Sequence, residues 1–153
     1  MSNQNLALTG SIGEELVFKY LSESGLVDAA ALSENAFDMH KDILAIKDGR
    51  RLKVECKTRT VIRKHYAMPL EKDQWYKADN ADLLYFITNP TSEDEPVSIY
   101  EATPNCYSLV DDFGPRKTQV RMYDLGKMKK VKTYNDPEVI SRLYNLSASR
   151  YKQ

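Results

Sequence analysis

The stretch from Asp42 to Lys57, DILAIKDGRRLKVECK, is the part of the sequence that most strongly predicts local structure. It reads as a β-hairpin, because two apolar-rich arms flank Asp48-Gly49, and Asp-Gly between such arms is a strong signal for a two-residue turn. Counting outward from that turn places Asp42 opposite Glu55, unless a bulge shifts the register. Opposite residues share a face of the sheet, with Cβ atoms about 4.5–5.5 Å apart. We therefore expect two carboxylates side by side at the open end of the hairpin.

The alternation of side chains along the two arms separates an apolar face from a charged one. The charged face gathers Asp42, Glu55 and Lys57 at one end. Like charges directly opposite destabilise a sheet, and Mg²⁺, which is typically held by one or two carboxylates with substrate phosphates and water, would remove this penalty. Lys57 would then face a phosphate or a metal-bound water. The alternative is a surface ion-pair cluster in which Lys57 neutralises the two acids. The apolar face comprises Ile43, Ala45, Leu52, Val54 and Cys56.

The composition indicates a globular protein. The chain has 153 residues, enough for one domain with a sizeable core, and is 42% hydrophobic and 29% charged. It contains no apolar run near the roughly 18 residues of a membrane span and no signal peptide at its start, so we expect an intracellular, cytoplasmic protein with no membrane partner. Cys56 and Cys106 form neither a C-x-x-C pair nor a disulfide framework.

The formal net charge of zero hides an uneven distribution. Residues 91–112 carry acids without Lys or Arg, whereas residues 115–134 are strongly basic, and a second basic stretch, RTVIRKH, begins at Arg59 directly after the hairpin. Such runs are either solvated faces or phosphate contacts. We expect both basic stretches, 59–64 and 116–132, to hold a nucleic-acid backbone, and the first adjoins the hairpin.

Periodicity predicts a mixed α/β domain with helices on a central sheet. A helix is expected over residues 11–25, with Ser11 and Glu14 as a capping box and Gly25 just past its end. A closing helix is expected from Asp136, as its N-cap, to residue 152. The other predicted elements are strands at 42–47, 51–57, 82–88, 97–103 and 118–125 and a helix at 70–81.

The hairpin resembles the motif of the PD-(D/E)XK nuclease superfamily, in which an Asp at a strand start and a short turn precede Asp or Glu, any residue, and Lys. The matching residues are Asp42, Glu55, Cys56 and Lys57. The upstream stretch GEELVFKYLSESG is similar to the opening helix of many members, with Glu14 at the acidic position. The proline that names the motif is absent, since Lys41 precedes Asp42. Over roughly residues 10–60 the order and spacing look closest to archaeal-type Holliday-junction resolvases and related phage or restriction-type endonucleases.

The resemblance implies a restriction-endonuclease-like fold, a central mixed sheet flanked by helices, forming a single nuclease domain over residues 1–153. It also implies a metal-dependent DNA endonuclease that hydrolyses phosphodiester bonds with Mg²⁺ or Mn²⁺. Asp42, Glu55 and the backbone carbonyl of Cys56 would bind the ion. Lys57 would position the attacking water or stabilise the phosphate, and Glu14 would reach the site from the helix.

Several assignments stay open at this level. Asp38 is the alternative to Asp42 as the metal-binding aspartate, and His40 is expected on the surface. The expected nucleic-acid contacts are Thr58, Arg59, Arg63, Lys64 and Gln74.

We expect DNA as the partner, and a homodimer or higher homo-oligomer, because small nucleases that cut two strands are often symmetric dimers. The alternatives are a non-catalytic DNA-binding or assembly module on a degenerate nuclease fold, a structure-specific resolvase, and an RNA-directed nuclease.

Overall fold

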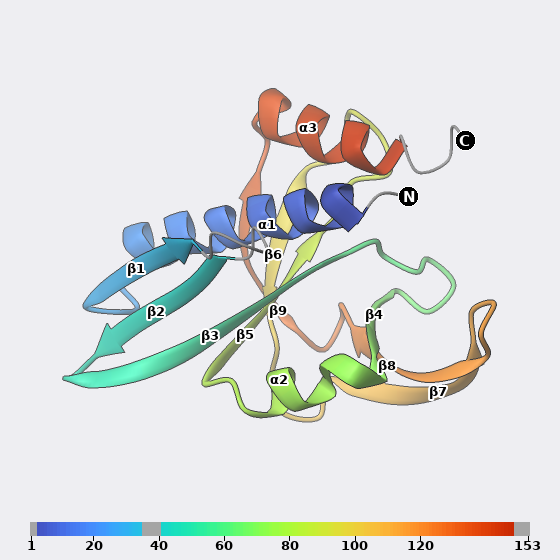
Figure 1. Cartoon of the computed structure of the whole chain (residues 1–153), viewed down its shortest axis with the longest axis horizontal. Helices are drawn as coiled ribbons and strands as arrows, with labels where there is room; N and C mark the ends of the chain where they lie inside the picture. The colour runs from blue at the N-terminus through green and yellow to red at the C-terminus, as the bar shows by residue number, and fades with distance from the viewer. Residues whose placement is uncertain (1–2, 35–40, 149–153) are drawn as a thin grey trace.

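The computed structural model describes residues 3–34 and 41–148, which form three α-helices, one 3-10 helix and nine strands within these ranges (Figure 1). In chain order these are α1 (Asn3–Ser24), β1 (Ala29–Glu34), β2 (Lys41–Lys47), β3 (Arg50–Arg59), β4 (Ala67–Glu71), η1 (Lys72–Gln74), α2 (Trp75–Asp79), β5 (Leu83–Thr88), β6 (Val97–Glu101), β7 (Tyr107–Phe113), β8 (Thr118–Asp124), β9 (Lys129–Tyr134) and α3 (Pro137–Ala148).

The strands form two sheets. The larger is six-stranded in the order β1-β2-β3-β5-β6-β9 and is mixed, because β3 and β5 run parallel while its other neighbours run antiparallel. The smaller is antiparallel in the order β4-β8-β7. Helices α1 and α3 cover one face of the large sheet, and α2 with the small sheet lies on the other side (Figure 1). The expectation of an α/β fold with a mixed sheet is therefore confirmed.

The hairpin has the predicted register. Ile43 pairs with Val54 and Lys47 with Arg50, which leaves a two-residue turn between β2 and β3. Asp48 has φ 53° and Gly49 has φ 75°, the two positive values that a type I′ turn requires. A turn of this type matches the twist of the flanking strands. The β2–β3 pairing therefore continues from the turn without a bulge.

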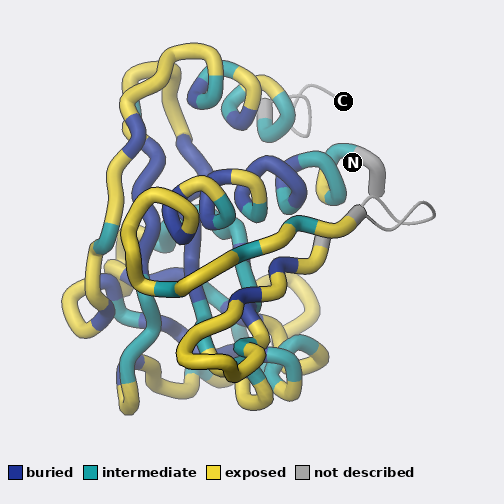
Figure 2. Tube along the Cα trace, turned by 90° about the vertical axis from the view of Figure 1, so that its left-hand side faces the viewer, coloured by how far each residue is buried: buried dark blue, intermediate teal, exposed yellow. Residues whose placement is uncertain are grey.

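Two apolar clusters lie on opposite faces of the large sheet. Helix α1 buries a stripe of apolar side chains against β2, β3 and β5. Burial of each large apolar side chain there contributes about 1.5–3 kcal/mol to the free energy of folding. Figure 2 shows buried segments where the helices meet the sheet. It also shows that the turn end of the β2–β3 hairpin is exposed. The second cluster joins β5 and β6 to the small sheet and α2 and includes Met68, Leu70, Phe86, Tyr100 and Tyr123.

The first helix begins eight residues earlier than predicted, so the proposed capping box is wrong. Ser11 is an interior helix residue that is only 8% exposed, because α1 packs closely on β3 at this point. The end of the helix is as expected, since Gly25 has φ 73°. The cap of the closing helix is also confirmed, because the backbone N–H of Glu138 donates to Asp136 Oδ1 at 3.0 Å.

Four strands were missed, and the helix expected over 70–81 is shorter than predicted. Strand β1 is rich in alanine, a helix-forming residue. Strand β4 contains Pro69, which an edge strand tolerates because one side of it needs no ladder hydrogen bond. Strands β7 and β9 are edge strands with many exposed charged residues, which mask their alternation. No helix in the described part of the chain is long and apolar enough to span a membrane.

Candidate functional site

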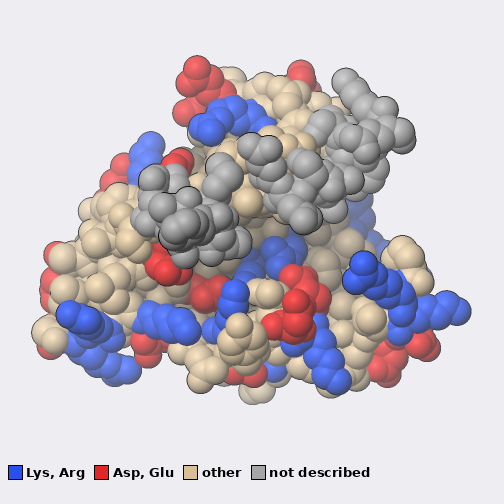
Figure 3. Space-filling view, viewed as in Figure 1, with Lys and Arg blue, Asp and Glu red and all other residues tan. Residues whose placement is uncertain are grey.

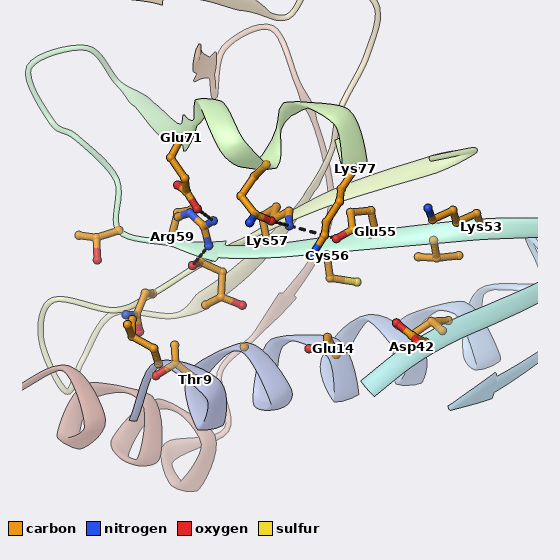
Figure 4. Close-up of a pocket in the computed structure, with 18 of the residues that line it drawn as sticks. Thr9, Glu14, Asp42, Lys53, Glu55, Cys56, Lys57, Arg59, Glu71 and Lys77 are labelled. Atoms are coloured by element: carbon orange, nitrogen blue, oxygen red, sulfur yellow. Dashed lines mark hydrogen bonds and ion pairs between the residues drawn. The ribbon is translucent and has the colours of Figure 1, made fainter. Parts of the chain in front are cut away.

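The candidate site lies along a part of β3 that β2 does not cover. In the described residues the β2–β3 ladder ends at Ile43–Val54, whereas β3 continues to Arg59 on its other side, where it pairs with β5. A pocket of about 970 Å³ opens along this edge. The N-terminal half of α1 and the end of α3 line one side, and η1 with α2 lines the other (Figure 4). Figure 3 shows basic and acidic side chains close together around the hollow between these layers.

Lys57 is the most unusual residue of this pocket because its charged side chain is only 8% exposed. Its Nζ lies 3.0 Å from Glu55 Oε1 and donates a 2.6 Å hydrogen bond to Gln74 Oε1. Glu55 is itself 19% exposed, so both charges are largely removed from bulk water. The ion pair that the sequence left open as an alternative is present between Lys57 and Glu55, and it is largely buried instead of lying on the surface. A buried ion pair adds little net stability, because removing two charges from water costs about as much as their attraction provides. Buried charged groups that line a cleft are instead typical of functional sites.

The two remaining predicted acids line the same pocket. Asp42 is exposed on β2, one residue beyond the last β2–β3 pair, and Glu14 projects from α1 (Figure 4). Asp42 also faces Ser33 of β1 in the neighbouring ladder. Glu14, Asp42, Glu55 and Lys57 are thus brought to one pocket from three separate elements. Asp38 and His40 lie outside the described residues.

Cys56 points to the opposite side of β3 from its two charged neighbours (Figure 4). Burial raises the pKa of its thiol well above the usual range, and the carboxylates of Glu14 and Glu55 raise the pKa further. The thiol is therefore protonated at neutral pH and is a poor nucleophile and a poor metal ligand. Any contribution of this residue to ion binding comes from its backbone carbonyl, as the resemblance implies.

The predicted nucleic-acid contacts are only partly gathered at the pocket. Arg59 lines it and is ion-paired with Glu71 at 2.7 Å. The Thr58 hydroxyl is buried against α1 without a hydrogen-bond partner in the described structure, so its orientation gives no support to a phosphate contact. Arg63 and Lys64 are exposed on the loop that follows β3, outside the lining of this pocket.

The basic stretch 115–134 does not form one surface. It divides between β8 and β9, and its central Arg121 is only 7% exposed. The Arg121 guanidinium makes two hydrogen bonds to Asp79, at 2.7 and 2.9 Å, and lies between the rings of Trp75 and Tyr107. This residue ties α2 to the small sheet. Its role is structural, and it is unavailable to phosphate.

Some residues of the pocket were not identified from the sequence. Lys53 and Lys77 add cations to the lining, and Asn89 adds an amide whose Oδ1 is buried without a hydrogen-bond partner in the described structure. The alternation that placed Glu55 and Lys57 on one face of β3 also places Lys53 there, so that signal was available. No sequence pattern connects Lys77 or Asn89 to the hairpin, because only the packing of α2 and the end of β5 brings them near it.

The donor set suits a hard divalent cation without forming a complete cage. Among the described residues no three His, Cys, Asp or Glu side chains form a ready metal-binding group. Mg²⁺ does not require one, since it usually takes one or two carboxylates and keeps several waters alongside substrate phosphates. The carboxylates of Asp42 and Glu55 with the Cys56 carbonyl are oxygen donors of that kind. No family model, curated protein or solved structure matches the chain.

Proposed function

We propose that the protein is a metal-dependent DNA endonuclease of restriction-endonuclease-like fold, with its active site in the pocket along β3. The observation that carries the proposal is the buried Lys57 beside Glu55, in a pocket that Asp42 and Glu14 also line. Acids and a lysine gathered at a cleft are suited to hydrolysis of a phosphodiester, whose transition state gains negative charge.

Lys57 is held in a fixed position for this task. An ammonium has three N–H donors, and Glu55 and Gln74 accept two of them. The third would reach a phosphate oxygen or the attacking water. Because Lys57 and Glu55 are largely withdrawn from bulk water, such a bond is stronger than the same bond at an exposed surface. Gln74, expected from the sequence to contact nucleic acid, would thus act by orienting Lys57.

The carboxylates would hold the ion. Asp42, Glu55 and the Cys56 carbonyl would bind Mg²⁺ or Mn²⁺, which supplies activation of the attacking water and offsets the developing charge. Glu14 would approach the same region from α1. The cations Lys53, Lys77 and Arg59 would hold the backbone of the DNA on either side of the cleaved bond.

Cleavage is expected to require added metal. Purified protein incubated with supercoiled plasmid should cut it in Mg²⁺ or Mn²⁺ and should not cut it in excess chelator, because the two carboxylates alone do not activate water. The amounts of nicked and linear plasmid on a gel provide the measurement. The Lys57→Ala variant in Mg²⁺ serves as a control for contaminating nucleases. Full cleavage in chelator, or equal cleavage by the control, would reject the proposed site, and binding without any cleavage would favour the non-catalytic module.

DNA affinity is expected to fall steeply with salt, because neutralised phosphates release bound counterions. The double change Arg63→Glu and Lys64→Glu should weaken binding to every sequence and flatten the plot of log affinity against log salt by about one unit for each lost contact. The matched control reverses Arg116 and Lys117, which are exposed in the turn between β7 and β8, away from the pocket. If both double variants lost DNA affinity equally, the net charge of the protein and not a local contact would control binding.

A further inference from the structure

A β-bulge in β9 sends two nearby lysines to opposite faces of the large sheet. Ile99 pairs with Lys132 and Tyr100 pairs with Lys130, so Val131 is the extra residue. Paired residues share a face, and Ile99 belongs to the core beneath α1 whereas Tyr100 belongs to the core beneath the small sheet. In a regular strand residues 130 and 132 would point the same way. The bulge therefore turns Lys130 onto the Tyr100 side, where its Nζ lies 5.7 Å from the ring centre.

A second irregularity exposes an aromatic ring on the same side. The loop between β3 and β4 is closed by an isolated bridge between Ile62 and Ala67, and its four intervening residues, RKHY, are all exposed. Tyr66 has φ 49°, an uncommon conformation for an aromatic residue, and its side chain is one of the most exposed large apolar groups at 58%. Backbone strain of this kind collects at functional sites.

Both irregular positions line one pocket of about 380 Å³. Arg63 and Lys130 supply two cations, and Tyr66 and Tyr100 supply aromatic surface. The pocket also contains the acid Glu95, whose carboxylate accepts hydrogen bonds from the backbone N–H and hydroxyl of Thr91, so the lining carries two cations and one acid. The polar remainder of the lining consists of the hydroxyl groups of Thr88, Thr91, Ser98 and Thr133.

This second pocket is adjacent to the candidate active site along two segments of the chain. Thr60 lines the first pocket and Val61 the second, and in the same way Asn89 lines the first and Thr88 the second. The two pockets thus share the chain segments at the ends of β3 and β5, and we take the loop that bears RKHY as the connection between them. Two cations and an exposed aromatic ring are the kinds of side chain that bind the phosphates and the bases of a single strand.

We propose that the pocket of Arg63, Tyr66 and Lys130 binds one nucleotide of a single-stranded DNA segment that leaves the active site. The phosphate lies between Arg63 and Lys130, and the base stacks on Tyr66. Stacking on an aromatic side chain requires an unpaired base, which distinguishes this ligand from a continuous duplex. The inference rests on the proposed function for its polymer, and it deepens that function by assigning a substrate with a single-stranded arm.

The test measures binding of fluorescein-labelled fifteen-nucleotide oligo(dT), and of a blunt duplex of the same length, by anisotropy in excess chelator. Tyr66→Gly should weaken binding of the single strand about five- to a hundredfold and change duplex binding much less, as expected for loss of one stacked base. Its melting temperature should stay equal or rise, since glycine adopts a positive φ without strain. Lys130→Glu should weaken single-strand binding about three- to tenfold.

The matched control is Lys132→Glu, which makes the same charge change two residues away on the other face of the sheet and should alter affinity less than about twofold. Equal losses for the two lysine variants, or unchanged binding in Tyr66→Gly, would overturn the proposal. Complete displacement of the oligonucleotide by inorganic phosphate would reduce the pocket to a phosphate site and would also overturn it. The assay needs no cleavage, so it separates the two proposals. If the protein never cuts DNA but still binds the single strand through Tyr66, the nuclease proposal fails and the binding proposal stands.

Discussion

Replacing Asp42 by Asn should abolish DNA cleavage and leave the fold intact. The substitution keeps the size of the side chain but removes the charge of one proposed ion ligand, and a bound metal supplies several kcal/mol of stabilisation to the transition state. A loss of about 3 kcal/mol or more corresponds to a rate reduction of about a hundredfold or more. Initial rates of plasmid nicking in Mg²⁺ measure this. DNA affinity in chelator should hold or improve, since one acid facing the phosphates is gone.

Asp42 is the most informative of the four acidic and basic site residues because it is exposed on β2. Glu55→Gln would also be inactive, but it would strip the partner from the largely buried Lys57, which destabilises proteins by about 3–5 kcal/mol. Loss of activity in that variant would therefore not separate chemistry from folding. The stability of Asp42→Asn should hold or rise slightly, because a repulsion between neighbouring carboxylates is relieved.

The matched control for this variant is Asp28→Asn. Asp28 lies at the other end of the hairpin, where its Oδ2 accepts a hydrogen bond from the backbone N–H of Asp48 at 2.7 Å, so its replacement should leave cleavage unchanged. A fully active Asp42→Asn would refute the ligand assignment. If Asp38→Asn were instead inactive, the ion would belong to Asp38, and if both stayed active the non-catalytic module would be favoured.

Gly13→Ala should destabilise the protein by about 2–3 kcal/mol, although alanine normally stabilises a helix interior by about 1 kcal/mol relative to glycine. A Cβ at Gly13 would lie 2.0 Å from Thr58 Oγ1 and 3.4 Å from Thr58 Cβ. Thr58 is β-branched and lies on a strand bonded to β5, so it has little freedom to withdraw. The Thr58 side chain must change its χ1 rotamer or helix α1 must move away from β3. Thermal unfolding of the purified variant measures the effect.

Gly10→Ala is the matched control, because it is the same change three residues earlier in the same helix. Its Cβ would meet only Glu14 Oε1, at 3.8 Å, so it should stabilise the protein by about 0.5–1 kcal/mol. The two variants should differ in melting temperature by about 5–16 °C, at about 2–4 °C per kcal/mol for a chain of this size. Adding Thr58→Ala should recover much of the stability lost in Gly13→Ala. Equal melting temperatures for the two glycine variants would contradict the close approach.

The same close approach is relevant to the site, since Glu14 directly follows Gly13. Separating α1 from β3 would withdraw the Glu14 carboxylate from the pocket. Gly13→Ala should therefore also lower the cleavage rate of the fraction that remains folded.

How much of the site the sequence could predict depends on whether a residue is placed by local geometry. The hairpin was predictable because Asp48-Gly49 selects a two-residue turn, and that turn sets the register of every pair out to Ile43 and Val54. The alternation of the strand then puts Glu55 and Lys57 on one face. The capping box at Ser11 failed although its local signal was clear, because burial of the helix against β3 outweighed the preference of one residue for a helix start.

The sequence by itself determined the hairpin, the α/β class of the domain, and the face on which its charged residues lie. Only the tertiary structure decided that β2 stops short and leaves the edge of β3 open, that Lys57 is buried between Glu55 and Gln74, and that a bulge turns Lys130 toward Tyr100. The physical reason is range. Turn type and side-chain alternation act between neighbouring residues, whereas burial and the meeting of distant side chains depend on how the whole chain packs.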